Sequence, residues 1–367
     1  MGKLLVISAA ANDAYSLSAK YLLENKLDTV KEGAAKYAQL IGAEELLYFL
    51  PEGFSDMGLA PVAFGKASPV MDNAYAVVQQ LKGNLPRPMI LDDFVAEYEG
   101  KEVSVITPEA AYLLINPDTK FITVNKDGKS EVKEVKYGTK LSEVEAAEGA
   151  KAVLLGGLKG RFVLPSQLFD FTVGDCILCT SITVFGQDAC MVKTLSELMG
   201  QTWENTCGKC VLCREGSLQA KTMVEDMPAG KGKITDLDLL KDIAPLIMEG
   251  AYCPYGQNWP KTVLSALELF GGEFEDHIKR KSCAADICFK KGAAYIILPD
   301  KCTGCMDCID ECDATAIEGK KGFIHMIDQD MCEQCGKCVD SCDEGAIVTV
   351  EGKLPKLPKK LTRVGKF

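Results

Sequence analysis

The sequence predicts a multidomain chain of α/β plus α+β class, and three observations support this prediction. The chain has 367 residues, which at roughly 150 residues a domain suggests two or three domains. Stretches such as "LQAKTMVEDM" and "ITDLDLLKDIAPLIMEG" have apolar residues at helical spacing in its middle part. Short β-rich segments, "AAYIILPD" and "AIVTVEG", flank cysteine-rich loops towards its end. Helical and strand-forming parts therefore follow one another along the chain.

Composition excludes several classes of partner. The formal net charge is -11, and phosphate backbones and anionic lipids both require clustered positive charge. The apolar run Leu4 to Ile7 is shorter than the roughly 7 residues of a signal peptide, and no stretch approaches the roughly 18 of a membrane span. We therefore expect a cytoplasmic protein without nucleic acid binding or membrane insertion. In a reducing compartment its 17 cysteines indicate metal sites rather than disulfides.

Eight cysteines near the end of the chain repeat one spacing. The segments "CTGCMDCIDEC" and "CEQCGKCVDSC" both read C-x2-C-x2-C-x3-C. This doubled run resembles bacterial two-cluster ferredoxins, in which three close thiolates hold one cluster and the fourth cysteine crosses to the other. The resemblance implies two [4Fe–4S] sites. The ligands would be Cys302, Cys305, Cys308 and Cys342 in the first ferredoxin site, and Cys332, Cys335, Cys338 and Cys312 in the second.

The doubled run departs from the ferredoxin pattern at one position. The residue after the fourth cysteine is usually proline in that family, whereas here it is Asp313 or Asp343. Since local charge is among the factors that set a cluster's potential, these carboxylates predict low-potential clusters. The alternative is that both are exposed aspartates with little effect.

A third group of cysteines precedes the doubled run. "TCGKCVLCREG" contains Cys207, Cys210 and Cys213, and Cys253 follows in "GAYCPYGQ". The stretches between them have helical periodicity. A loop of three cysteines at one helix start, closed by a cysteine after the next helix, makes a third [4Fe–4S] site in a helical bundle.

These segments resemble a known family. "ENTCGKCVLCREG" and "CPYGQ" are similar to the flavoprotein subunit of NADH:quinone oxidoreductase and its relatives in soluble NAD-linked hydrogenases and formate dehydrogenases. In the hydrogenase relatives a two-cluster ferredoxin module follows, as here. The resemblance implies a degenerate Rossmann-like FMN/NADH-type domain over 1–117, a β-grasp domain over 118–170, a linker over 171–188, a helical bundle over 189–282, a ferredoxin-like domain over 283–350 and a basic extended tail over 351–367.

The flavin domain departs from the family where the ligands bind. The glycine-rich loop that cradles FMN and the nicotinamide nucleotide is missing, so backbone N–H groups cannot approach a pyrophosphate in the usual way. In "SAAANDAYS", Ala10 and Ala11 replace two acids of the family motif, and only Asp13 keeps one. We therefore expect a domain retained for architecture, without FMN. The alternative is a flavin held in a rearranged pocket.

One histidine lies close to two further cysteines. His277, Cys283 and Cys288 fall within twelve residues in "DHIKRKSCAADICF". Structural zinc commonly takes three thiolates and one imidazole, and Cys190 opens the first bundle helix at a place where the ferredoxin-bearing relatives have a cysteine. The prediction is a zinc site that clamps this helix to the segment leading into the ferredoxin module. Inert buried thiols are the alternative.

Three features remain open at this level. Cys176 and Cys179 are half of a site, a dithiol or two buried small side chains, with no reason to prefer one. His325 is expected to be a surface or packing residue. The basic tail "GKLPKLPKKLTRVGKF" reads as an extended arm, either solvated or docked on an acidic partner.

Three cluster sites without an evident general base, nucleophile or substrate pocket predict an electron-transfer subunit with no catalytic residues of its own. Its implied partners are a flavoprotein or metal-containing catalytic subunit and a small [2Fe–2S] subunit of the same oxidoreductase. Two hypotheses compete with this one. The first is that the chain is an FMN-containing NAD(P)H dehydrogenase subunit. The second is that it is a scaffold whose clusters only stabilise the fold.

Overall fold

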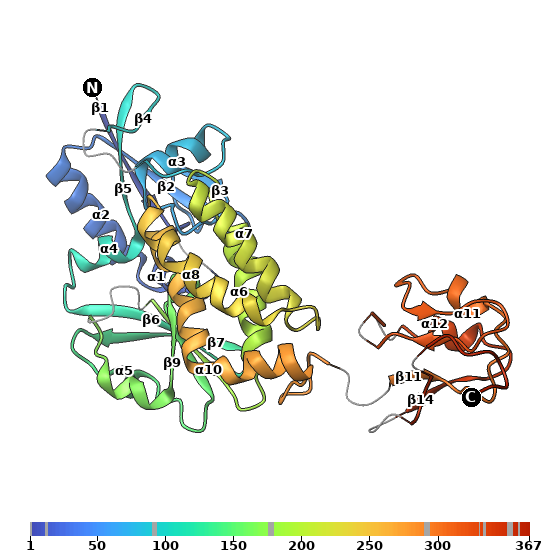
Figure 1. The fold of residues 1–367 in the computed structure, drawn as a ribbon. Coiled ribbons are helices and arrows are strands. Elements are labelled where there is room, and N and C mark those ends of the chain that lie inside the picture. The colour runs from blue at the N-terminus through green and yellow to red at the C-terminus, as the bar shows by residue number, and fades with distance from the viewer. Residues whose placement is uncertain are drawn as a thin grey trace. The chain divides into compact units, whose positions relative to one another are not determined.

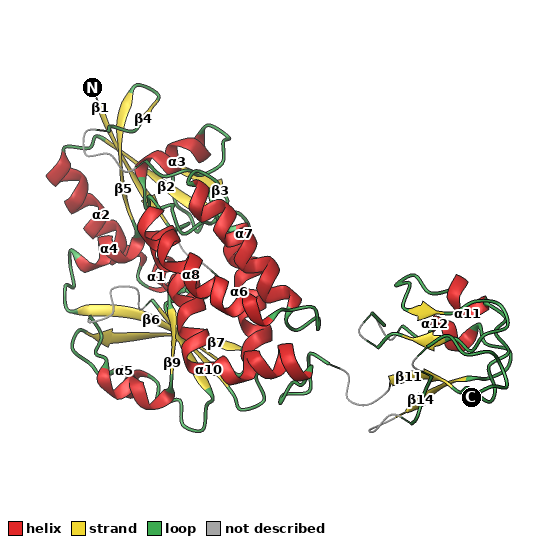
Figure 2. Ribbon diagram, in the orientation of Figure 1, coloured by secondary structure: helices red, strands yellow, loops and turns green. Residues whose placement is uncertain are grey.

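The computed structural model describes residues 2–11, 14–89, 94–174, 180–289, 294–329, 331–332, 335–350, 355–358 and 360–367. The chain forms two compact units, Met1–Ala285 and Asp286–Phe367 (Figure 1). Long helices and two larger sheets make up the first unit, whereas short strands, short helices and loops make up the second (Figure 2). Asp13, Cys176 and Cys179, which the sequence analysis singled out, lie outside the described residues.

A mostly parallel sheet opens the first unit. Its order is β3-β2-β1-β5-β4, and only β4 runs antiparallel to its neighbour. The strands are β1 (Gly2–Ser8), β2 (Glu45–Pro51), β3 (Val62–Gly65), β4 (Glu97–Tyr98) and β5 (Lys101–Ile106). Because β2 and β5 flank β1, the strand order reverses at the carboxyl end of β1, where doubly wound sheets bind ligands. The loop with Ala10 and Ala11 follows directly.

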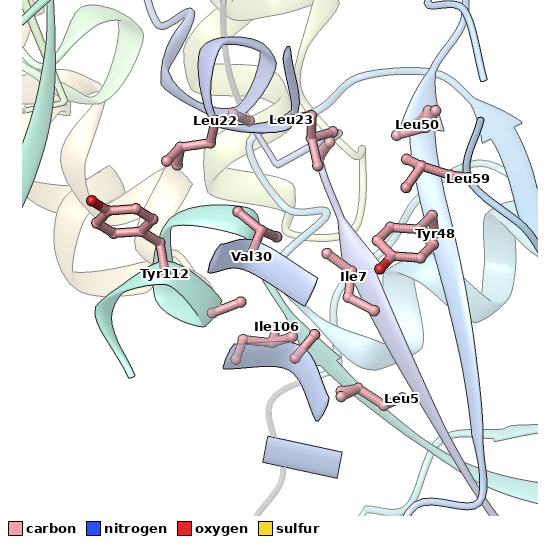
Figure 3. Close-up of a cluster of buried hydrophobic side chains, with 14 of the residues drawn as sticks. Leu5, Ile7, Leu22, Leu23, Val30, Tyr48, Leu50, Leu59, Ile106 and Tyr112 are labelled. Carbon is pink, nitrogen blue, oxygen red and sulfur yellow. The ribbon is translucent and has the colours of Figure 1, made fainter. Parts of the chain in front are cut away.

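Helices cover this sheet and bury its central strand. Leu5 and Ile7 of β1 pack against side chains of three helices, including Leu22 and Val30 (Figure 3). Leu4 and Val6 alternate with them and are also buried, as expected for a parallel strand covered on both faces. The short apolar run near the N-terminus is therefore a core strand. The helices of this region are α1 (Ser18–Asn25), α2 (Leu27–Ile41), α3 (Ala74–Leu81) and α4 (Pro108–Leu113).

The second sheet has the order β7-β6-β10-β8-β9. Its hairpin turns through Asp127 and Gly128, both at positive φ, as a two-residue Asp-Gly loop requires. The sequence analysis expected a linker over 171–188, but Ser181–Phe185 forms β10, the central strand. The elements are β6 (Thr119–Lys126), β7 (Lys129–Lys136), α5 (Leu141–Val144), β8 (Ala152–Leu155), β9 (Arg161–Val163) and β10, with 3-10 turns at Gly157–Lys159 and Pro165–Asp170.

The two sheets share a packed boundary. Phe121 of β6 is buried in the hydrophobic core beneath the first sheet and meets Tyr112 of α4 edge to face, with ring centroids 5.0 Å apart. The Ser18 hydroxyl donates a hydrogen bond to the Phe121 carbonyl at 3.2 Å. These contacts cross the expected domain boundary at 117/118, so the flanking domains form one continuous structure.

Five helices complete the first unit and carry the cysteines at their starts. Cys190, Cys210 and Cys253 occupy the N-cap positions of α6, α7 and α9. The longest helix contacts α8, α6 and β9, so the bundle rests on the second sheet. The helices are α6 (Met191–Glu204), α7 (Val211–Asp226), α8 (Ile234–Gly250), α9 (Pro254–Asn258) and α10 (Pro260–Arg280).

The second unit is a structural repeat. The helix α11 (Asp307–Asp310) recurs thirty positions later as α12 (Lys337–Asp340), as do the cysteines around it. Two antiparallel strand pairs flank the helices, and the cysteine-bearing loops enclose a small apolar core. The paired strands are β11 (Ala294–Ile297) with β14 (Ile347–Val350), and β12 (Ile317–Glu318) with β13 (Met326–Ile327).

Part of the basic tail lies against its own ferredoxin-like unit. The Ile324 N–H donates to the Thr362 carbonyl at 2.8 Å, and the Val364 N–H donates to Gly322 at 3.2 Å. A β-bridge joins Phe323 to Arg363. The sequence predicted an arm that is either solvated or docked on an acidic partner. Part of it instead pairs with residues of its own chain. Among the described residues, no helix is both long enough and apolar enough to cross a bilayer.

Candidate iron–sulfur and metal sites

Four cysteines converge at the starts of α7 and α9, and we call this group the bundle site. Cys207, Cys210 and Cys213 come from the loop and first turn of α7, and Cys253 caps α9. The Tyr252 N–H donates to the Cys210 sulfur at 3.3 Å. Burial, and to a smaller extent the neighbouring thiols, raise the pKa of Cys213 to about 11. Clustered thiolates in such a place need a cationic centre, so this donor set fits iron.

The wall of the bundle site has two further features. Trp259 is fully buried, and its indole N–H makes no completed hydrogen bond within the described residues, although it lies near enough to Cys213 to lower the pKa of that thiol. Gly256 brings the backbone of α9 close to the same sulfur, since a Cβ there would lie 3.3 Å from Cys213 Sγ and 2.6 Å from the Cβ of Ala251. The orphaned indole N–H suits a bound group.

The ferredoxin-like unit contains two thiol-lined cavities of about 290 and 340 Å³ of empty space. Each is lined by three cysteines of one run and the fourth cysteine of the other. The first cavity has Cys302, Cys305, Cys308 and Cys342 in its wall, and the second has Cys312, Cys332, Cys335 and Cys338. The structure therefore brings together both sets that the repeat implies. Burial raises the pKa of Cys308 to about 12, which again suits thiolates bound to a cation.

Backbone amides support these cavities symmetrically. The Ala316 N–H donates to the Cys312 sulfur at 3.3 Å, and the Ala346 N–H donates to Cys342 at 3.4 Å. Asp313 is exposed and pairs with Lys337 at 2.6 Å, while Asp343 is exposed. Lys337 offsets the charge of Asp313, which favours the alternative that this aspartate has little effect on the cluster potential.

His325 is buried, with 1% of its surface exposed. Its Nδ1 lies 3.1 Å from the sulfur of Cys308, and its backbone N–H lies 3.5 Å from the sulfur of Cys302. Burial lowers the pKa of His325, and the nearby Lys320 backbone offsets part of this shift. The Nε2 atom has no hydrogen-bond partner among the described residues. The expectation of a surface residue is therefore wrong, and the alternative of a packing residue omits the contact with Cys308.

A fourth cluster of donors joins α6 to the end of α10. One ligand atom from each of four residues lies within 4.8 Å of all the others; these residues are Cys190, His277, Cys283 and Cys288. The His277 Nε2 lies 3.2 Å from Cys190 Sγ. Its Nδ1 donates to the Glu273 carbonyl at 2.8 Å, which leaves Nε2 as the nitrogen available to a metal.

An open cavity with about 560 Å³ of empty space adjoins the bundle site. Its wall includes Lys66, Ser68, Glu204 and Cys207. The Ser68 N–H donates to the Ala10 carbonyl at 2.9 Å, which ties this wall to the loop after β1. The rearranged flavin pocket thus has a candidate place, whereas the family's acidic side chains are absent from Ala10 and Ala11.

Comparisons with known proteins identify the two cysteine-rich regions. Residues 193–277 match the NADH-ubiquinone oxidoreductase-F iron-sulfur binding region. The chain therefore carries the iron–sulfur region of the F subunits. Residues 301–347 match a 4Fe-4S dicluster domain. The F-subunit region spans the bundle site and reaches His277, and the dicluster domain contains all eight cysteines of the two thiol-lined cavities.

Proteins similar to this chain include hydrogenase subunits. The NADP-reducing hydrogenase subunit HndC of Solidesulfovibrio fructosivorans is 35% identical over 177 residues, which are 46% of this chain and 36% of that protein. The NAD-reducing hydrogenase HoxS subunit alpha of Cupriavidus necator is 26% identical over 244 residues, 60% of this chain and 40% of that protein. The alignments thus span less than half of these relatives.

A solved structure shares the fold of most of the chain. The structure of an NAD+-reducing [NiFe]-hydrogenase in the H2-reduced state superposes with a TM-score of 0.68 at 19% identity. The match covers 76% of this chain and 56% of that one. The structural match shows a shared fold, while the two family matches confirm the iron–sulfur regions that the cysteine spacing predicted.

Proposed function

We propose that this chain is an iron–sulfur electron-transfer subunit of a multi-subunit oxidoreductase. It relays single electrons through three [4Fe–4S] clusters between a partner's redox centre and a catalytic subunit or ferredoxin. The observation that carries the proposal is the convergence of four cysteine thiols at each of three places, two of them thiol-lined cavities. Each cluster, when bound, supplies one-electron chemistry. The ligand sets are those of the bundle site and the two ferredoxin sites.

The chain's own groups prepare these sites. One or two cysteines of each site are buried, and N–H groups of Tyr252, Ala316 and Ala346 donate to sulfurs of the three sites. Such donors stabilise negative charge on sulfur and hold each ligand in one orientation. The names of the relatives, which are subunits of NADP- and NAD-reducing hydrogenases, support partner subunits within one complex. A flavoprotein or metal-containing catalytic subunit and a small [2Fe–2S] subunit are the partners that the family resemblance implies.

Iron content tests the cluster assignment. Anaerobically purified protein should contain about 12 iron atoms per chain, and a Cys213→Ser variant about 8. EPR of the reduced protein should show interacting signals from the two ferredoxin sites. Iron near 8 in the wild type would remove one site. Clusters that stay oxidised while the purified complex turns over would instead favour the scaffold hypothesis.

A second candidate function is an FMN-containing NAD(P)H dehydrogenase subunit. The cavity lined by Lys66, Ser68 and Glu204 beside Cys207 is the observation that favours it. An acid extract with about one flavin per chain would establish this alternative. Bleaching of the clusters by NADH in the isolated chain would do so as well.

The donors at the end of α10 support one structural zinc ion, with Cys190, His277, Cys283 and Cys288 as ligands. Three thiolates and an imidazole are a common closed zinc set, and Zn–S and Zn–N distances of about 2.0–2.3 Å fit donors this close. The Lys193 N–H approaches Cys190 Sγ at 3.4 Å, and the Glu273 carbonyl fixes the imidazole. The ion would tie the start of α6 to the chain beyond α10.

A pair of variants separates zinc from iron. Cys283→Ser should lose the zinc and keep about 12 iron atoms, whereas Cys213→Ser should keep the zinc and lose about 4 iron atoms. Elemental analysis of both metals on each protein provides the measurement. A wild type without zinc, or zinc unchanged in Cys283→Ser, would return these residues to buried thiols.

A further inference from the structure

The two ferredoxin sites differ at one repeat-related position. Cavity residues recur thirty positions apart, as Ile297 and Ile327 do, and Ile317 and Ile347 do in the opposite cavities. At the same offset, Tyr295 lines the second cavity and His325 lines the first. An aromatic phenol in one half of the repeat is thus an imidazole in the other.

The imidazole is held against one sulfur. Its Nδ1 lies 3.1 Å from Cys308 Sγ in a fully buried position. Gly319 permits this placement, because a Cβ there would collide with the ring. The tail holds the backbone next to His325, because the Ile324 N–H donates a hydrogen bond to the Thr362 carbonyl. Among the described residues, the Tyr295 hydroxyl makes no comparable hydrogen bond to a cysteine.

The chemistry of a cluster ligand decides which atom donates. A ligating Cys308 is a thiolate without a proton, so the nitrogen that contacts it must bear the hydrogen. Reduction adds one electron to the site and more negative charge to its sulfurs. A hydrogen bond to sulfur therefore stabilises the reduced state more than the oxidised state. No bond breaks, and the proton stays on Nδ1.

We propose that His325 donates an Nδ1–H hydrogen bond to Cys308 and thereby raises the potential of the first ferredoxin site above that of the second. The inference rests on the clusters of the proposed function. Its consequence is a directional bias within the repeat, because an electron that reaches this unit resides preferentially at the site beside His325. Two binding sites built from one repeat are thereby made unequal by a single side chain.

Three substitutions test the hydrogen bond in the full chain. His325→Phe and His325→Leu remove the donor, and His325→Gln keeps an N–H. A redox titration monitored by EPR should show that one of the two ferredoxin potentials is lower in His325→Phe and His325→Leu than in the wild type. The expected loss is roughly tenfold in the reduction equilibrium, which is about 59 mV for one electron. Gln should restore most of it, and Tyr295→Phe should leave both potentials unchanged.

Iron content keeps the two levels of inference apart. A wild type with little iron contradicts the proposed function itself. Full iron with equal potentials in wild type, Leu and Gln overturns the role of His325 alone. If the Phe variant loses iron because its ring does not fit, the comparison of Leu with Gln decides, and a Gln potential no higher than that of Leu refutes the hydrogen bond.

Discussion

Replacement of Gly256 by alanine should remove the bundle cluster while leaving the ferredoxin sites loaded. A Cβ at this position would lie 2.6 Å from the Cβ of Ala251 and 3.3 Å from Cys213 Sγ. Carbon atoms in contact prefer about 3.5–4.0 Å, so α9 and Ala251 must separate by roughly 1 Å. Metal sites tolerate ligand displacements of only about 0.2 Å. The shift therefore exceeds the tolerance of the site several times over.

The energetic terms support the same outcome. Alanine is favoured over glycine in a helix by about 1 kcal/mol, while overpacking a tight site costs about 1–3 kcal/mol. The net cost is too small to unfold the chain, so the effect should be local. Gly271→Ala in α10 is the matched control, because nothing lies within 4 Å of its added Cβ.

The assay is iron per chain with EPR of the dithionite-reduced protein, both under anaerobic conditions. Gly256→Ala should contain about 8 iron atoms and keep the interacting ferredoxin signals, and Gly271→Ala should contain about 12. A Gly256→Ala protein with full iron and an unchanged spectrum would show that the wall of the bundle site yields, and the steric reasoning would be wrong.

Two further predictions concern the flavin domain and the α10 junction. The isolated chain should carry no stoichiometric FMN and should not oxidise NADH, because Ala10 and Ala11 replace two of the family's acids after β1; flavin fluorescence of an acid extract measures this. Lys151→Met should lower the melting temperature by a few degrees, since it leaves Glu273, only 14% exposed, without its ion pair at 2.8 Å. Lys279→Met, which breaks an exposed 2.6 Å pair with Glu275, should change it little.

Sequence spacing predicted the groups that local chain geometry determines. The first three cysteines of each run lie a few residues apart, so the loop itself brings their sulfurs together, whereas the crossing of Cys312 and Cys342 was expected from the resemblance to two-cluster ferredoxins. The convergence of Cys190 with His277 over a long separation was expected from the family resemblance, in which a cysteine opens the first bundle helix, and not from spacing. The ion itself and the ligand sets stay predictions.

Features that depend on packing could not be read in the same way. The segment Ser181–Phe185 was taken for a linker, because five residues without a long periodic pattern carry little information until the sheet around them exists. The sequence did not indicate a role for Trp259 or Gly256 at the bundle site, because a residue that packs close to a cysteine sulfur has no characteristic spacing from it. His325 did carry one, because an alignment of the two repeats places it opposite Tyr295.

The pairing of the C-terminal arm with residues 322–324 ties the end of the chain to the environment of a redox site. The terminal residues of proteins usually tolerate substitution, because few contacts restrain them. Here a change at Thr362 or Val364 would loosen the backbone next to His325. Selection on the electron affinity of the first ferredoxin site would therefore extend to the tail, and an affinity tag joined at Phe367 would lie only a few residues from that pairing.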